Sequence, residues 1–271
     1  ACERFGMDIA MVAIRHGDTA TSPYSTGTYA SRSMVMAGGA IARTCDVLGL
    51  QIRRIGAHLL QCEFDDTCIR DACVIGPSSA VTLAEIARVW HRNPEELPAD
   101  VDPAGVEVTS GFRPSPDNSP FSYATHACVV RIDPELGHVE LLDYVISEDC
   151  GTIVNPMIVD GQIIGGALQG VGTALYEESC YDADGQPLSS TFADYIMPGS
   201  THLPNLRVDH LVTPSPLTEY GVKGLGEGGA IPPPAAIANA INDALRGYGV
   251  EVAETPVTPR RILETIAGSK T

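Results

Sequence analysis

Basic residues are scarce in this chain of 271 residues, which has 17 Lys and Arg against 34 Asp and Glu and a formal net charge of −17. A protein this acidic gains nothing from releasing the counterions of nucleic acid, and anionic membrane surfaces repel it. Long apolar runs are also missing, because no stretch approaches the roughly 18 residues that a spanning helix needs. We therefore expect no nucleic-acid partner and no membrane span. The 44% of hydrophobic residues indicates a packed globular protein.

Paired metal-binding cysteines are missing as well. The eight cysteines contain no C-x-x-C pair. Cys62, Cys68 and Cys73 form a C-x5-C-x4-C pattern, which matches neither the usual zinc spacing nor the plant-type ferredoxin spacing. We therefore expect no metal bound by the protein's own side chains. Reduced, mostly buried thiols and a cytoplasmic location are expected instead.

The start of the chain has no initiator Met and no targeting pattern. Residue 1 is Ala, and neither a charged segment before an apolar core nor an Arg-rich transit segment follows it. Removal of Met before Ala would explain this start. Origin as a downstream piece of a longer protein would explain it equally well.

Hydrophobic periodicity predicts an α+β fold, with a mixed sheet and helices, no regular βαβ alternation and no internal repeat. A capping box at Thr82 and Glu85 marks the start of one helix. The acidic, proline-bearing segment 95–105 is the best candidate for a sub-domain boundary. The expected helices cover 34–60, 83–92, 156–177, 232–245 and a short segment from 259, and the expected strands cover 7–16, the hairpin 125–149 and 206–213.

Glycine is concentrated in segment 221–229, GVKGLGEGG, where five glycines surround a single carboxylate, Glu227. Such glycines let main-chain N–H groups approach a ligand or let the chain adopt positive φ angles. The formal G-x-G-x-x-G match is not a dinucleotide site, because no strand directly precedes it and the acidic residue about 20 positions on would be Asp243 in a helix. A flexible surface loop would also explain the glycines. The proline-opened apolar helix that follows favours a buried loop.

Two further segments have the chemistry of a binding site. Segment 27–33, GTYASRS, places small residues and hydroxyls before a predicted helix, where free amides attract an anion. A capped helix without a ligand would look the same. Gln162 lies near the start of a glycine-rich helix and could bond a polar ring, or it could be an ordinary buried glutamine. The glycines of this helix are expected to let another backbone or a ligand approach closely, namely Gly165, Gly166, Gly170 and Gly172.

Four strings, in this order, resemble one family closely over essentially the whole chain. They are HGDT with GTYASRS and AGGA, then DCGTIVNPMIVDGQIIGGALQGVGTALYEE, then TFADYIMP with LPNL, then GVKGLGEGG with PPAAIANAINDAL. The chain resembles the C-terminal molybdopterin-binding half of the molybdenum hydroxylase large subunit, of the xanthine dehydrogenase and aldehyde oxidase family. The resemblance implies that 1–271 is this molybdopterin-binding domain, which can divide into sub-domains 1–105 and 106–271.

The resemblance also implies roles for single residues. Glu227 matches the family's catalytic glutamate beside the molybdenum. A dry, glycine-lined pocket would suit it, because burial raises the pKa of a carboxyl group toward the value that a general base needs. The implied cofactor contacts are Ala30, Ser31 and Ser33 at the phosphate end of the pterin, Gln162 on the pterin itself and Gly226 through its backbone.

The implied cofactor is molybdopterin, as the pterin alone or as a dinucleotide, whose dithiolene binds the metal without a protein ligand. Iron–sulfur clusters and flavin would sit on partner subunits, and a companion chain would supply the upstream half of the molybdenum subunit. The implied activity is hydroxylation of an aldehyde or N-heterocycle, a small-molecule substrate, with oxygen from water and Glu227 as general base. A carbon monoxide dehydrogenase-like subunit is one alternative. A non-catalytic assembly module of the same fold is another, although the presence of Glu227 argues against it.

Overall fold

The computed structural model describes residues 1–103, 106–114, 120–202 and 205–268, and the chain forms two compact units. Unit 1 comprises Ala1–Gly27 and Ser33–Ser115, and unit 2 comprises Thr28–Arg32 and Pro116–Thr271. The short segment Thr28–Arg32 therefore belongs by its contacts to unit 2. The predicted sub-domain boundary after residue 105 adjoins residues 104–105, which lie outside the described part, and it stays a prediction.

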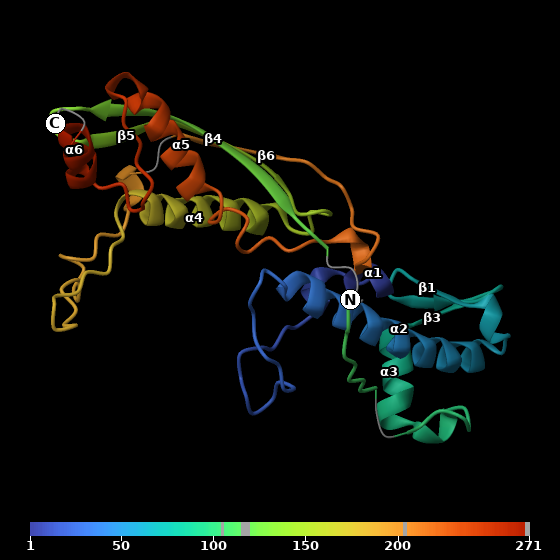
Figure 1. Cartoon of the computed structure of the whole chain (residues 1–271). Coiled ribbons are helices and arrows are strands. Elements are labelled where there is room, and N and C mark those ends of the chain that lie inside the picture. The colour runs from blue at the N-terminus through green and yellow to red at the C-terminus, as the bar shows by residue number, and fades with distance from the viewer. Residues whose placement is uncertain (104–105, 115–119, 203–204, 269–271) are drawn as a thin grey trace. The chain divides into compact units, whose positions relative to one another are not determined.

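Unit 1 combines one long helix, two shorter helices and a small antiparallel sheet of order β1-β2-β3 (Figure 1). Helix α2 approaches the central strand at Gly56, where a Cβ atom would lie 2.6 Å from Cγ1 of Val74. The core includes Ile55 and Trp90. The elements are α1 (Cys2–Phe5), η1 (Ile9–Met11), α2 (Ser33–Leu60), η2 (Phe64–Asp66), β1 (Cys68–Arg70), β2 (Cys73–Ile75), β3 (Ala80–Thr82), α3 (Leu83–Arg92) and η3 (Pro94–Glu96).

The strand predicted over 7–16 is wrong, because this segment contains the short 3-10 helix η1 and otherwise irregular backbone. A strand needs a neighbour to pair its N–H and C=O groups. None of the described strands pairs with this segment. The three short strands between 68 and 82 were not predicted, because the local sequence has no clear strand pattern there.

The cysteines are all free thiols, as expected. Cys45 and Cys150 are buried, but Cys68 and Cys180 are exposed and the other four are intermediate, so the expectation of mostly buried thiols is wrong. Cys68 begins β1, which is an edge strand with one unpaired side.

Unit 2 is built on the sheet β4-β5-β6, in which β4 and β5 are antiparallel and β5 and β6 are parallel. Helices α4 and α5 pack together over this sheet, and a core that includes Tyr144, Ile163 and Ile237 lies between them (Figure 1). The elements are β4 (Tyr123–Asp133), β5 (His138–Asp149), α4 (Pro156–Leu175), η4 (Ser200–His202), β6 (Leu206–His210), η5 (Glu219–Gly221), α5 (Pro233–Leu245), η6 (Arg246–Tyr248) and α6 (Pro259–Gly268).

The predicted hairpin and helices of unit 2 are confirmed, and with them the α+β fold class. Asp133 starts the hairpin turn by accepting hydrogen bonds from the main-chain N–H groups of Glu135 and Leu136, and Gly137 has a φ of 67°. Asn155 caps α4 through a bond from the N–H of Ile158 to Oδ1 at 3.3 Å. Within the described ranges, no helix has both the length and the apolar character to cross a membrane.

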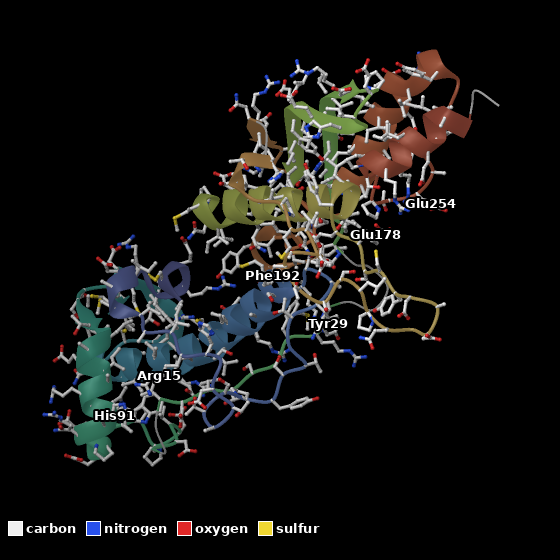
Figure 2. All side chains as sticks on the ribbon, turned by 90° about the vertical axis from the view of Figure 1, so that its left-hand side faces the viewer. Arg15, Tyr29, His91, Glu178, Phe192 and Glu254 are labelled. Carbon is white, nitrogen blue, oxygen red and sulfur yellow. The ribbon has the colours of Figure 1, made fainter. Side chains whose placement is uncertain are left out.

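The connection from α4 to η4 is a long segment with exposed side chains, and Phe192 on it is 84% exposed (Figure 2). The connection begins beside α6. There Arg261 lies 3.8 Å from a carboxylate oxygen of Glu178 and 3.6 Å from one of Glu254, and both glutamates are labelled in Figure 2. The pair with Glu178 fastens the first residues of the connection to α6, and the Tyr195 hydroxyl, further along it, donates to Oε2 of Glu177 at 2.6 Å.

Candidate functional site

The glycine-rich segment 221–229 connects η5 to α5 in unit 2 and lies against helix α4. A Cβ atom on Gly229 would lie 2.4 Å from the carbonyl oxygen of Ile163. A Cβ atom on Gly170 of α4 would lie 2.7 Å from Cγ of Pro233. The expected close backbone approach is therefore confirmed at these contacts. It is wrong for Gly165, where a Cβ atom would meet nothing within 4 Å.

Ser31 and Glu227 are joined by two hydrogen bonds. The Ser31 hydroxyl donates to Oε2 of Glu227 at 2.8 Å and accepts from the main-chain N–H of Glu227 at 2.9 Å. One hydroxyl thus fixes both the backbone and the side chain of the glutamate. A carboxylate held in this way has fewer accessible rotamers, which is what a group that must meet a reacting atom requires.

Ala30 and Ser31 have left-handed backbone conformations, with φ angles of 50° and 55°. A non-glycine residue in this region costs about 1–2 kcal/mol, so it persists only where surrounding contacts maintain it. The bonds from Ser31 to Glu227 are such contacts. Consecutive left-handed residues turn the chain sharply and present the Ser31 hydroxyl to the glycine-rich segment.

Gln162 and Gly226 lie beside this pair. A Cβ atom on Gly226 would be 3.6 Å from Oγ of Ser31 and 3.8 Å from Nε2 of Gln162. Gln162 is exposed on α4, so it is not an ordinary buried glutamine. The structure therefore brings these sequence-predicted residues together with Glu227. Ser33 is the first residue of α2 in unit 1, and its predicted role stays a prediction.

A pocket of about 570 Å³ opens at this place in unit 2. Its lining includes Ala30, Ser31, Phe121, Glu148 and Glu227. The side chain of Glu227 is exposed to solvent at the mouth. The expected dry setting for this carboxylate is therefore absent from the part of the chain that the structure describes. The segment is neither a free surface loop nor fully buried, because its two ends are buried and its centre is open.

Glu148 is a buried acid of the pocket that sequence reasoning missed. It is 1% exposed, and neither carboxyl oxygen has a hydrogen-bond partner within the described structure. Burial raises the pKa of Glu148, nearby His210 lowers it and Asp149 raises it, to about 7. Alternation along β5 could have found it, because Tyr144, Ile146 and Glu148 occupy successive inward positions.

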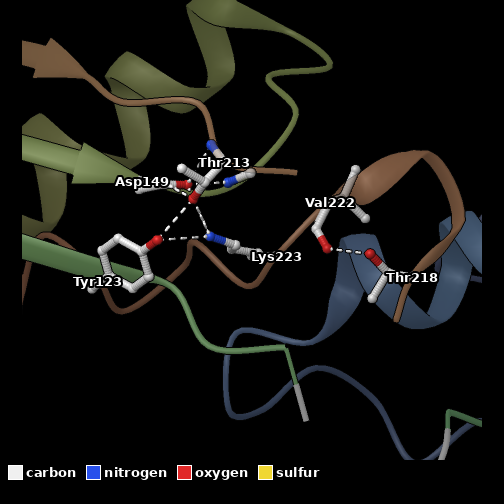
Figure 3. A network of polar contacts seen from close by, with 7 residues as sticks. Tyr123, Asp149, Thr213, Thr218, Val222 and Lys223 are labelled. Atoms are coloured by element: carbon white, nitrogen blue, oxygen red, sulfur yellow. Dashed lines mark hydrogen bonds and ion pairs between the residues drawn. The ribbon is translucent and has the colours of Figure 1, made fainter. Parts of the chain in front are cut away.

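The start of the glycine-rich segment is fixed by a buried ion pair between Lys223 and Asp149 (Figure 3). Lys223 Nζ lies 3.1 Å from Oδ1 of Asp149 and 2.8 Å from Oγ1 of Thr213. The same ammonium group stands 4.4 Å from the centre of the Tyr123 ring. The Thr213 hydroxyl also donates to Oδ2 of Asp149. This network fixes Lys223, four residues before Glu227.

The charges in this network suit their surroundings. Burial raises the pKa of Asp149, but hydrogen bonds from Thr213, the N–H of Gly151 and Lys223 outweigh it and lower the pKa to about 2. Burial lowers the pKa of Lys223, but its hydrogen bonds to Asp149 and Tyr123 have the larger effect, so the pKa lies above its usual value. Both groups therefore carry their charge near neutral pH. A lone Lys among five glycines was the sequence sign of this anchor.

Comparison with known proteins identifies the family. Residues 1–204 match the molybdopterin cofactor-binding domain. The chain belongs to this family. It is 35% identical to the nicotine 6-hydroxylase large subunit of Paenarthrobacter nicotinovorans, over 99% of this chain and 33% of that protein. It is 34% identical to the carbon monoxide dehydrogenase large chain of Hydrogenophaga pseudoflava, over 96% of this chain and 32% of that protein. The chain thus spans about a third of the length of these relatives.

Solved structures show the same fold of the molybdopterin cofactor-binding domain. Quinoline 2-oxidoreductase from Pseudomonas putida 86 matches with a TM-score of 0.84 and 35% identity, over 92% of this chain and 32% of that one. The Cu,Mo-CO dehydrogenase matches with a TM-score of 0.85 and 30% identity, over 94% of this chain and 32% of that one. The predicted resemblance and fold are therefore confirmed.

The residues around the pocket fit a molybdopterin. Three neighbouring groups can form hydrogen bonds with a polar ring system: the Ser31 hydroxyl, the Gln162 amide and the backbone of Gly226. In the described ranges, no three His, Cys, Asp or Glu side chains form a group that could ligate a metal ion. Such a donor set suits a group that brings its metal on its own ligands and needs only hydrogen bonds from the protein.

Proposed function

We propose that this chain is the cofactor-binding part of a molybdenum hydroxylase that oxidises an aldehyde or an N-heterocycle with water as the oxygen source. The paired hydrogen bonds between Ser31 and Glu227 are the observation that supports it best. They aim a carboxylate into a pocket whose other polar groups fit a pterin. When bound, the molybdenum cofactor supplies the centre that accepts the electrons of the oxidation.

Glu227 is the general base in this proposal. Its Oε2 accepts the hydrogen bond from the Ser31 hydroxyl, and its Oε1 accepts no hydrogen bond from the described residues. Oε1 is therefore the atom that takes the proton. Gln162 and the backbone of Gly226 hold the pterin, and Ala30, Ser31 and Ser33 hold its phosphate end. The Lys223–Asp149 pair keeps the segment in place while the proton moves.

The exposure of Glu227 supports a further part of the proposal. A base works best where water is excluded, and the described residues leave this carboxylate open. Relatives named as large subunits are about three times as long as the matched region. We therefore infer that a companion chain or domain closes the pocket. Iron–sulfur and flavin subunits would take the electrons onward in a cytoplasmic complex.

A carbon monoxide dehydrogenase-like activity is the second candidate, since the chain is 34% identical to one such large chain. Assays of the purified complex with carbon monoxide and with a panel of aldehydes and N-heterocycles separate the two. Oxidation of carbon monoxide alone would favour the second candidate.

The role of Glu227 is tested by Glu227→Gln in the complete complex. The variant should keep the molybdenum content of the wild type and lose turnover by a factor of about 10² to 10⁴, the usual contribution of a general base. Glu251→Gln, an exposed glutamate outside the pocket lining, is the control and should keep full activity. Near-normal turnover of Glu227→Gln would show that the assigned role is wrong.

The need for a companion is tested separately. The chain purified alone should lack turnover and should regain it on mixing with the companion. Full molybdenum content and turnover of the isolated chain would contradict this part of the proposal without affecting the role of Glu227.

A further inference from the structure

Glu148 lies directly under the glycine-rich segment, at the wall of the pocket that Glu227 also lines. A Cβ atom on Gly228 would be 2.8 Å from Oε1 of Glu148 and 3.0 Å from its Oε2. The acid therefore approaches the backbone one residue after Glu227. Because its oxygens are buried without partners, an interaction inside the pocket is missing from the described residues.

His210 stands on the other side of Glu148. The two residues are Cα partners in the parallel ladder between β5 and β6, so their side chains point to the same face of the sheet. Nδ1 of His210 is also buried and has no hydrogen-bond partner among the described residues. Its Nε2 lies 2.7 Å from Oδ1 of Asp160 on α4, and the Asp160 side chain is 52% exposed. Glu148 and His210 thus lie side by side in the sheet without a hydrogen bond between them, and one water molecule between them would satisfy both groups. His210 reaches the surface through Asp160.

We propose that Glu148 and His210 form a proton relay that carries the proton taken up by Glu227 to Asp160 at the surface. The relay rests on the proposed function of Glu227 as a base. The proton passes from Glu227 through water in the pocket to a carboxyl oxygen of Glu148, and then through one bridging water to Nδ1 of His210. The proton on Nε2 of His210 moves to Oδ1 of Asp160 and from there to solvent. His210 is then left with its proton on Nδ1, and rotation of the ring to solvent, where the proton exchanges between the two nitrogens, restores the Nε2–H tautomer before the next proton arrives.

The charges around Glu148 suit a group that both accepts and releases a proton. Burial and the neighbouring Asp149 raise its pKa and His210 lowers it, to about 7, so both forms are populated near neutral pH. The other titratable groups near it are Cys150 just after the end of β5, Glu227 across the pocket and Tyr123 on β4. Burial and the adjacent acids raise the pKa of the Cys150 thiol, which leaves it neutral.

The first test observes Glu148 itself by infrared spectroscopy of the complete complex. The wild type should show a carboxylic acid band that titrates at about pH 7. The band should be absent from Glu148→Gln and present in Glu148→Asp. His210→Gln should move its midpoint to higher pH, because His210 lowers the pKa of this acid. A band that persists in Glu148→Gln, or a midpoint that His210→Gln leaves unchanged, would overturn the proposal.

The second test measures turnover across pH. Glu148→Gln and His210→Gln should each lower kcat by about tenfold and change its pH profile, and the double variant should be no slower than either single variant, since both interrupt one route. Glu148→Asp should restore part of the rate. Asp209→Asn, an exposed residue on the opposite face of β6, is the matched control and should match the wild type.

The outcomes separate the relay from other roles. Loss of molybdenum from Glu148→Gln would make Glu148 a cofactor contact and overturn the relay, as would a wild-type rate. If Glu227 is not the base, Glu227→Gln stays active while the infrared band of Glu148 still titrates. Failure of the proposed function is therefore distinguishable from failure of the relay.

Discussion

The hydroxyl of Ser31 donates to the carboxylate of Glu227 and accepts from its main-chain N–H, although 196 positions separate the two residues in the chain. This reciprocal pair joins the small-residue segment to the glycine-rich segment within unit 2. The carboxylate is thereby oriented by a residue that carries no charge.

Replacement of Ser31 separates orientation from backbone strain. Ser31→Ala and Ser31→Gly both remove the hydroxyl, so both should reduce kcat of the complete complex. Glycine tolerates the φ of 55° that alanine resists, so Ser31→Gly should be more stable than Ser31→Ala by about 1 kcal/mol. Thermal unfolding and steady-state kinetics measure the two effects. Equal stability of the variants would mean that the strain is relieved in another way.

Two helical glycines of α4 should respond oppositely to alanine. Gly170→Ala places a Cβ atom 2.7 Å from Pro233 and should destabilise the fold by about 1–3 kcal/mol. Gly165→Ala meets nothing within 4 Å and should stabilise it by up to about 1 kcal/mol through helix propensity. Denaturant unfolding of both variants provides the comparison. A destabilised Gly165→Ala would contradict the open space at that position.

The Lys223–Asp149 pair should matter both for stability and for its pH dependence. Lys223→Met leaves a buried carboxylate unpaired and should cost about 3–5 kcal/mol. The pKa of Asp149 is lowered from 3.8 to about 2, so its contribution is complete above pH 3.8 and is lost as pH falls toward 2. Unfolding free energies measured across acidic pH should show this loss in the wild type. Asp149→Asn should not show it.

Glu148 should impose the opposite pH dependence. Its pKa is raised from 4.5 to about 7, so the unfolded chain loses this proton first and stability falls as pH rises through that interval. The fall should reach about 3 kcal/mol, from 1.36 kcal/mol per unit of pKa. Glu148→Gln should abolish the fall and be more stable than the wild type above neutral pH. Glu135→Gln, at the exposed hairpin turn, is the control and should leave the fall intact.

Local sequence was sufficient for the regular elements of unit 2. The β4–β5 hairpin followed from alternation around a turn, and α4 and α5 followed from helical spacing with a cap or prolines at the start. It was insufficient for β1 to β3, which are three residues long and are defined by their neighbours. It misled for residues 7–16, where an apolar run without a partner strand does not form a ladder.

The sequence by itself determined the family, through four strings of neighbouring residues in a fixed order, and the segment that carries Glu227, in which five glycines surround one carboxylate. Only the tertiary structure decided that Ser31, Gln162 and Gly226 meet this carboxylate, that Lys223 is anchored on Asp149, and that Glu148 is buried without a partner. The physical reason is range. Helix and hairpin signals act over a few residues, whereas burial and hydrogen bonds between distant segments exist only once the chain has folded.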